Sequence, residues 1–267
     1  MDLVHHYTNY QALECILKNK TLRLNRLDKV DDRQEMSLIS QSHWAQYLFV
    51  SSWSASMNEC EAMWSRYAGY NGIRITLPKF PFHKIQLKSA PELNSFVGDN
   101  TYSPIPFELI YNDEWLFVNT PIIPEMYGRE VTYSNTPESD VMPIIRHVDG
   151  GIKFNLYDLA TFKDIAWSYQ KEFRYIFFIV PSSPDVMANW KSSGDPSFVY
   201  QHLFRCLTTQ ADAPLSYFDI PLGDALNHLE VTIGPKCNET DISNVELLLN
   251  EYVPNATIRK SALTGYV

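Results

Sequence analysis

Residues 172–180 constrain the fold most, because every side chain after the third is apolar or aromatic. Side chains on a β-strand alternate between two faces, so a strand of this composition must be covered on both sides. Its polar entry carries Glu172 and Arg174, which the same alternation places on one face. The segment therefore predicts a central strand in a sheet with further layers packed against both faces.

Strand and helix patterns continue on either side of this segment. The chain has 267 residues, of which 45% are hydrophobic, so it can bury a substantial core, and we expect one mixed α/β domain over residues 1–267. A capping-box pattern at Thr8 and Gln11 marks the start of a first helix. Further strands are expected at 3–8, 21–24, 47–53, 72–77, 229–235 and 256–259, and further helices around 63–67 and at 241–252.

Residues 88–150 differ from the rest of the chain, since proline and asparagine are frequent there. Prolines interrupt the pattern repeatedly and leave only short strand-like pieces. Within this stretch, only residues 130–133 have the pattern of a sheet strand. We expect the segment to form an insertion or loop-rich lid within the domain.

Cysteine spacing and net charge exclude several classes of protein. The four cysteines, Cys15, Cys60, Cys206 and Cys237, lie far apart without a C-x-x-C pair, which indicates reduced core residues and neither a disulfide framework nor a zinc site. The formal charge of −9 argues against a protein that coats nucleic acid, although a local basic groove is compatible with it. No apolar run is long enough to span a bilayer, so we expect a cytoplasmic protein with no membrane partner.

Three segments combine reactive side chains with apolar surroundings. In residues 5–8 two histidines adjoin a tyrosine, and the alternative is an edge strand whose histidines face water. Ser52 and Ser54 precede the helix at 63–68, where aromatic packing in the core is the alternative. For residues 171–174, an internal ion pair explains the charges as well as a functional carboxylate does.

The three segments together resemble a large family of uncharacterised bacterial proteins. That family opens with an H-Y-T strand, matched by His6-Tyr7-Thr8, and carries an M-W-x-x-Y-A helix, matched by residues 63–68. Its W-x-x-E-x-E-x-R motif is matched by Trp167 and residues 171–174, and the likeness covers most of the chain. One departure is Gln170, which stands where the family usually has the first glutamate.

The family in turn resembles the ADP-ribosyltransferases, whose signature is His, then Tyr or Ser, then Glu on three strands. The resemblance implies an α+β fold with a split mixed β-sheet core, peripheral helices and a loop-rich central insertion. It implies that NAD is the substrate, that His6 holds its ribose, and that the backbone around Tyr7 and Thr8 meets the nicotinamide amide. Glu172 would be the catalytic carboxylate.

The middle position of the signature has two alternative matches. One is Tyr67, together with Trp64, and the other is the pair Ser52 and Ser54. Arg174 would either hold Glu172 ionised or contact an NAD phosphate. No metal is required in this reaction class.

The chemistry gives an independent reason for a carboxylate at such a site. Breaking the bond between nicotinamide and ribose creates positive charge on the sugar, as in glycoside cleavage. A carboxylate bonded to the 2′-hydroxyl stabilises that charge more than it stabilises the substrate. Glu172 is the expected position of this group.

These observations favour an NAD-dependent ADP-ribosyltransferase that acts as a bacterial toxin or phage-defence effector. Its acceptor would be an unknown protein or nucleic acid, and an antitoxin is a conceivable partner. The alternatives are an NAD glycohydrolase on the same site and a catalytically inactive domain that binds a nucleotide or a partner. The acidic residues Asp28, Asp31, Asp32 and Glu35 suggest a further alternative, a nuclease that binds magnesium, although a solvated loop explains them adequately.

Overall fold

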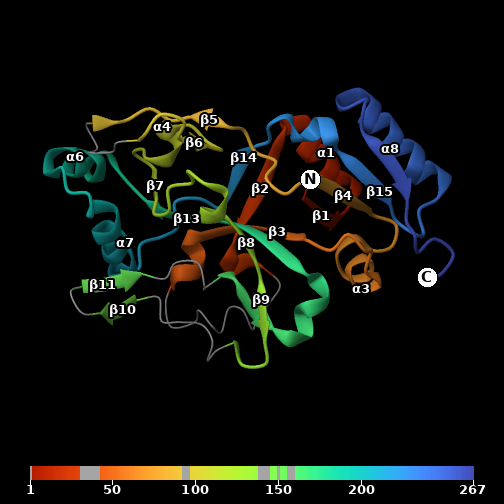
Figure 1. The fold of residues 1–267 in the computed structure, drawn as a ribbon, viewed down its shortest axis with the longest axis horizontal. Coiled ribbons are helices and arrows are strands. Elements are labelled where there is room, and N and C mark those ends of the chain that lie inside the picture. The colour runs from red at the N-terminus through yellow and green to blue at the C-terminus, as the bar shows by residue number, and fades with distance from the viewer. Residues whose placement is uncertain (1, 31–42, 92–96, 138–144, 149–150, 155–159) are drawn as a thin grey trace.

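The computed structural model describes residues 2–30, 43–91, 97–137, 145–148, 151–154 and 160–267, and it has an α+β fold (Figure 1). Within these ranges, ten strands form one large mixed sheet. They are β1 (Leu3–Thr8), β2 (Thr21–Arg26), β3 (Leu48–Ser54), β4 (Ile73–Pro78), β7 (Trp115–Phe117), β8 (Gly128–Glu130), β13 (Glu172–Pro181), β14 (Tyr217–Pro221), β15 (Glu230–Ile233) and β16 (Thr257–Lys260). The path β14-β2-β3-β1-β4-β15-β16 runs across the sheet, and β13 attaches to β3.

Helices and small two-stranded sheets surround the main sheet. The α-helices are α1 (Tyr10–Asn19), α3 (Glu61–Met63), α4 (Phe107–Ile110), α6 (Pro184–Ser193), α7 (Phe198–Thr209) and α8 (Glu239–Tyr252). Among the short helical turns, η3 (Trp64–Ala68) is a π-helix, and η1 (Leu27–Lys29), η2 (His43–Tyr47), η5 (Pro124–Met126), η7 (Ile165–Gln170) and η8 (Asp224–His228) are 3₁₀ turns. The small sheets pair β5 (Ile85–Gln86) with β6 (Tyr102–Ser103), β9 (Thr132–Ser134) with β12 (Phe162–Asp164), and β10 (Ile145–Val148) with β11 (Gly151–Phe154).

The central strand predicted at 172–180 is confirmed as β13, which is buried along its length up to Val180. Its odd-numbered side chains, such as Phe173 and Phe177, join a core that α1 and α8 complete. Its even-numbered side chains from Ile176 onward join a second core that includes α6 and α7. Both faces of the strand are therefore covered, as its composition requires.

β3 positions the polar entry of β13. The two strands run antiparallel from Glu172↔Ser54 to Phe178↔Leu48, so Ser54 and Ser52 share one sheet face with Glu172 and Arg174. On its other edge, β3 pairs with β1 at Ser54 and with β2 at Val50 and Phe49. β1 and β2 thus lie along the same edge of β3, with a gap between them from Ser54 to Val50.

The other predicted strands and helices are present, with differences at their ends. The first helix is capped by Asn9, whose side chain accepts from the Ala12 amide at 2.9 Å, so the capping box predicted at Thr8 is wrong. Thr8 instead ends β1, where its backbone pairs with β4. In α8, Leu248 is buried as a core residue, whereas Leu247 is exposed.

The middle of the chain contributes more sheet than its sequence pattern suggests. β7 and β8 both pair with β13, although only 130–133 was predicted as a strand there, and that stretch itself divides between β8 and β9. Each of these strands pairs with β13 over only three residues, which is too short to show an alternating sequence pattern. Their strand character comes from the pairing with β13. That this segment is an insertion or lid stays a prediction.

All four cysteines are free, but the expected burial holds only for Cys206. Cys15 is exposed, and Cys60 and Cys237 are partly exposed. Among the described residues, no group of three or more His, Cys, Asp or Glu side chains could hold a metal ion. No described helix has both the length and the apolar character needed to cross a bilayer.

Gly72 allows η3 to pack against the end of β1. A Cβ at this position would lie 2.3 Å from the carbonyl oxygen of Ala68 and 2.4 Å from that of Thr8. We expect Gly72→Ala to lower the free energy of unfolding by about 1–3 kcal/mol, measured by urea denaturation, because backbone must move to admit the methyl group. Gly98→Ala is the control, since its nearest neighbour would be Thr101 Oγ1 at 4.0 Å, and an equal loss in both variants would contradict the packing role of Gly72.

Candidate active site

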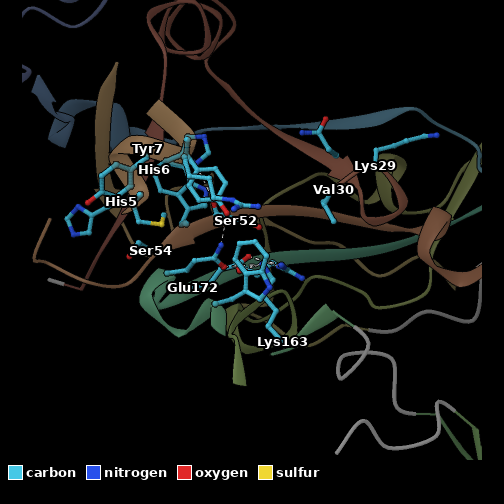
Figure 2. Close-up of a pocket in the computed structure, with 17 residues that line it drawn as sticks. His5, His6, Tyr7, Lys29, Val30, Ser52, Ser54, Lys163 and Glu172 are labelled. Atoms are coloured by element: carbon cyan, nitrogen blue, oxygen red, sulfur yellow. Dashed lines mark hydrogen bonds and ion pairs between the residues drawn. The ribbon is translucent and has the colours of Figure 1, made fainter. Parts of the chain in front are cut away.

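A pocket of about 480 Å³ lies where β1, β3, β13 and η3 meet (Figure 2). Its volume is within the range of small-molecule binding sites. Seven of the nine site residues predicted from sequence line it: His6, Tyr7, Ser52, Ser54, Tyr67, Glu172 and Arg174. Segments that are more than a hundred residues apart in the chain therefore meet in one cavity.

Strand register shows how the pocket reaches both faces of the sheet. His5 pairs with Ser54, and Ser54 pairs with Glu172, so these three side chains share one face. His6 leaves β1 on the opposite face, where its ring lies 5.1 Å from that of Trp53. His6 and Glu172 nevertheless line the same pocket, which lies beside the edge of β3 where β1 and β2 separate.

The imidazole of His6 is fixed by the backbone of β3. Its Nδ1 lies 3.0 Å from the carbonyl oxygen of Ser52, which can only accept, so Nδ1 carries the proton. Burial lowers the pKa of His6 and outweighs the opposite effect of this hydrogen bond. The ring is therefore neutral near pH 7, and its Nε2 carries a lone pair that can accept a hydrogen bond.

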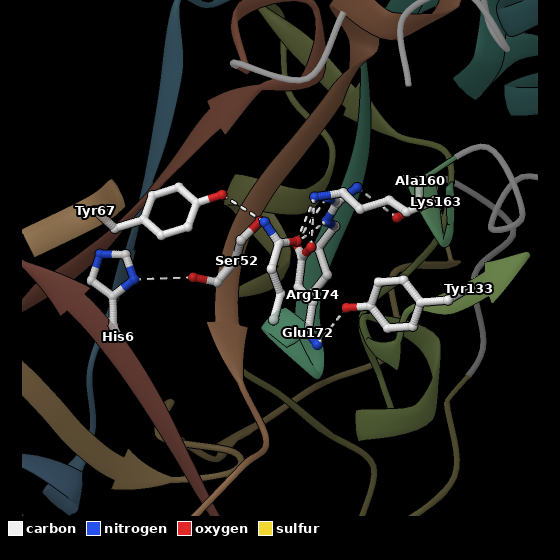
Figure 3. A network of polar contacts seen from close by, with 9 residues as sticks. His6, Ser52, Tyr67, Tyr133, Ala160, Lys163, Glu172 and Arg174 are labelled. Carbon is white, nitrogen blue, oxygen red and sulfur yellow. Dashed lines mark hydrogen bonds and ion pairs between the residues drawn. The ribbon is translucent and has the colours of Figure 1, made fainter. Parts of the chain in front are cut away.

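Glu172 is held by two cations in a buried network (Figure 3). Arg174 Nε donates to Oε1 at 2.8 Å, and Lys163 Nζ lies 2.7 Å from Oε2. The Glu172 amide donates to the hydroxyl of Tyr133 at 2.8 Å. β12 pairs with β9 through Lys163↔Tyr133, so one small sheet delivers two of these contacts.

The network keeps Glu172 ionised. Burial raises the pKa of this carboxyl, but the charges of Arg174 and Lys163, together with a hydrogen bond from the Ser52 side chain, outweigh burial and lower the pKa to about 2. Only 4% of the Glu172 side chain is exposed. The predicted role of Arg174 in holding Glu172 ionised agrees with this arrangement, while its contact with a phosphate stays a prediction.

Two predicted residues do not reach the pocket. Trp64 is fully buried and packs edge-on against Tyr7, and its indole nitrogen donates to Glu59 at 2.8 Å, so its ring cannot stack on a ligand. Thr8 is not among the lining residues either, although its neighbour Tyr7 is, so the predicted contact of the backbone around these two residues with nicotinamide stays a prediction. Tyr7 does line the pocket, and its hydroxyl accepts from the Cys60 amide at 3.1 Å.

Several pocket residues carried no predicted role. They include the basic residues Lys29, Arg66 and Lys163 and the polar residue Gln170. Arg66 and Gln170 lie within or beside the motifs that resemble the family, which could have drawn attention to them. Lys163 could not be found in this way, because its contact with Glu172 depends on the pairing of two short strands.

The pocket is positively charged although the chain is acidic. The lining of the pocket includes four basic residues, Lys29, Arg66, Lys163 and Arg174. Glu172 is the only carboxylate among its described lining residues. The chain as a whole has a formal charge of −9. Such a concentration of cations favours an anionic ligand.

Comparison with known proteins gives no relative. No family model, curated protein or solved structure matches this chain. The likeness to the uncharacterised bacterial family and to the ADP-ribosyltransferases therefore stays a prediction, and the function must be inferred from the pocket itself.

The acidic residues considered as a magnesium site lie mostly outside the described residues. Asp31, Asp32 and Glu35 belong to that part of the chain, and Asp28 pairs with Arg26, whose Nε donates to it at 2.9 Å. The nuclease hypothesis therefore gains no support from the described residues.

Proposed function

We propose that this protein is an NAD-dependent ADP-ribosyltransferase, whose ten-stranded sheet corresponds to the split mixed sheet of that superfamily. The observation that carries the proposal is that His6 and Glu172 line one pocket together with Tyr67 and Ser52. The pocket also has the surplus of basic side chains that a dinucleotide with two phosphates requires.

The proposed chemistry assigns separate tasks to the two ends of this arrangement. His6 accepts a hydrogen bond from a ribose hydroxyl through Nε2, since its Nδ1 is committed to Ser52. Glu172 bonds the neighbouring hydroxyl and stabilises the positive charge that develops on the sugar as nicotinamide leaves. Nicotinamide leaves with the electrons of the broken bond, and the acceptor supplies the electron pair of the new bond to the ribose carbon and releases its proton to solvent.

Lys29 and Arg66 are proposed to bind the phosphates of NAD. Both side chains are exposed at the pocket, while Lys163 and Arg174 are engaged with Glu172. We expect Lys29→Gln and Arg66→Gln each to weaken NAD binding about tenfold, measured by calorimetry, because each removes one charge-assisted contact.

The loss should shrink as the salt concentration rises, since contacts between exposed charges are screened. Lys191→Gln is the matched control, because Lys191 is exposed on α6 and does not line the pocket. Equal losses in the control and in the pocket variants would contradict the phosphate role.

The deciding experiment incubates the purified protein with radiolabelled NAD and bacterial lysate. Label transferred to a protein or nucleic-acid fraction supports the transferase and identifies the class of acceptor. Free ADP-ribose and nicotinamide without transfer would support the NAD glycohydrolase instead. We further propose a toxin or phage-defence role in the bacterial cytoplasm, which requires that induced expression slows growth and that Glu172→Gln relieves the effect.

A second candidate function is NAD binding without catalysis. The observation that favours it is that Glu172 forms ion pairs with both Lys163 and Arg174. These two cations weaken the electrostatic stabilisation that the carboxylate can give to a cationic transition state. Calorimetric NAD binding without any release of nicotinamide by the wild-type protein would support this candidate.

A further inference from the structure

The amide of Gln170 has only one chemically sensible orientation. This side chain is buried at the end of η7, between Lys163 and Tyr67. The Lys163 ammonium can only donate, so the amide atom that faces it at 3.1 Å must be the oxygen Oε1. The amide nitrogen Nε2 is then the atom 2.6 Å from the Tyr67 hydroxyl.

This orientation decides how the Tyr67 hydroxyl is used. An amide nitrogen donates, so the phenol oxygen of Tyr67 accepts the hydrogen bond from Gln170. The phenol proton therefore points away from Gln170, and Tyr67 lines the pocket.

The phenol retains that proton at neutral pH. Burial raises the pKa of Tyr67 to about 12, and the nearby Tyr169 acts in the same direction. The hydroxyl is consequently a permanent donor under physiological conditions.

We infer that the Tyr67 hydroxyl donates a hydrogen bond to an oxygen of the ligand, either a carbonyl or a phosphate oxygen. Gln170 is the positioning residue that imposes the direction of this hydrogen bond. Lys163 fixes Gln170 while it pairs with Glu172, so the carboxylate network and the donor are linked through one ammonium group. The identification of the ligand as NAD rests on the proposed function, whereas the direction of the hydrogen bond follows from the side chains alone.

Two substitutions test the inference through NAD affinity. Tyr67→Phe removes the donor and keeps the ring, and it should weaken NAD binding about tenfold in calorimetry. Gln170→Glu places a carboxylate beside the phenol, which draws the phenol proton to itself and away from the ligand. We expect about a tenfold loss here as well.

The double variant separates this effect from a simple change of charge. In the Tyr67→Phe background, Gln170→Glu should cost less than about twofold in affinity, because no phenol proton remains to be redirected. An equal cost of Gln170→Glu in both backgrounds would overturn the inference.

A measurement without NAD keeps the inference apart from the proposed function. Raman difference spectra between each protein and its Tyr67→Phe counterpart isolate this tyrosine, whose Fermi-doublet ratio distinguishes a phenol that mainly accepts from one that mainly donates. The ratio should fall in Gln170→Glu, and an unchanged ratio would overturn the inference. If the wild-type protein fails to bind NAD while the ratio falls, the proposed function is lost and the direction of the hydrogen bond is retained.

Discussion

Glu172→Gln should slow the release of nicotinamide from NAD by about a hundredfold or more, the largest effect on activity that we expect from a single substitution. Removing one preorganised group that stabilises transition-state charge costs on the order of 3 kcal/mol. Glutamine preserves the size of the side chain but removes its negative charge. The affinity for NAD should change much less than the rate, because the charge on the sugar develops only as the bond breaks.

The measurement is nicotinamide release under single-turnover conditions, with NAD binding followed separately by calorimetry. Glu130→Gln is the matched control, since Glu130 is an exposed carboxylate on β8 that also has a basic partner, Lys79. An unchanged rate in a folded Glu172→Gln protein would remove Glu172 from the chemistry.

The same substitution leaves Arg174 and Lys163 buried without their counter-charge, so its folding must be checked by thermal denaturation. Glu172→Asp is the second variant, because it retains the charge and moves it away from the pocket by one methylene. A folded Glu172→Asp protein should also be slow, since the carboxylate no longer meets the ribose hydroxyl in the same place.

The largest loss of stability is expected from Arg174→Leu, at about 3–5 kcal/mol of unfolding free energy. Arg174 is only 1% exposed, and its guanidinium binds both Glu172 and the carbonyl oxygen of Ala160, at 2.8 Å in each case. Leucine fills much of the same volume but leaves Glu172 and that carbonyl without these bonds. Urea denaturation measures the loss.

Arg23→Leu provides a control with the same residue type and a similar geometry. Arg23 makes two hydrogen bonds of 2.8 Å to Asp219, but 51% of its side chain is exposed. Exposed pairs of this kind contribute about 1 kcal/mol or less. Similar losses in the two variants would show that burial of the Arg174 pair has no energetic importance.

The dependence of stability on pH gives a second test of the same pair. The pKa of Glu172 falls from the ordinary value of 4.5 to about 2 in the folded protein. A carboxyl whose pKa is lowered by folding contributes stability that is fully present above the unfolded value and is lost as the pH falls toward the folded value. The wild-type protein should therefore lose stability between these two pH values, and Arg174→Leu should reduce this dependence.

The sequence was sufficient to predict elements whose side chains repeat with a clear period. β13 was recognised because every side chain after Arg174 is apolar, and such a strand has few alternatives. β7 was missed because three residues carry no period, and its strand character comes from its pairing with β13. The cap of α1 was misassigned since Thr8 and Asn9 are both good caps, and the end of β1 decides between them.

The candidate site followed the same division. His6, Tyr67 and Glu172 were found through their motifs and do line one pocket. Lys163 was not, because its contact with Glu172 arises from the pairing of β9 with β12, which no local pattern encodes. Trp64, which the resemblance offered together with Tyr67, packs in the core behind the pocket, and core packing was the alternative for this helix.

The bond between His6 and the backbone of β3 affects how this site would vary in evolution. The atom that selects the imidazole tautomer is the carbonyl oxygen of residue 52, which every amino acid possesses. Natural substitutions at Ser52 could therefore alter its hydroxyl while leaving the tautomer of His6 intact. An alignment would then score the position as variable, even though its main chain performs a constant task.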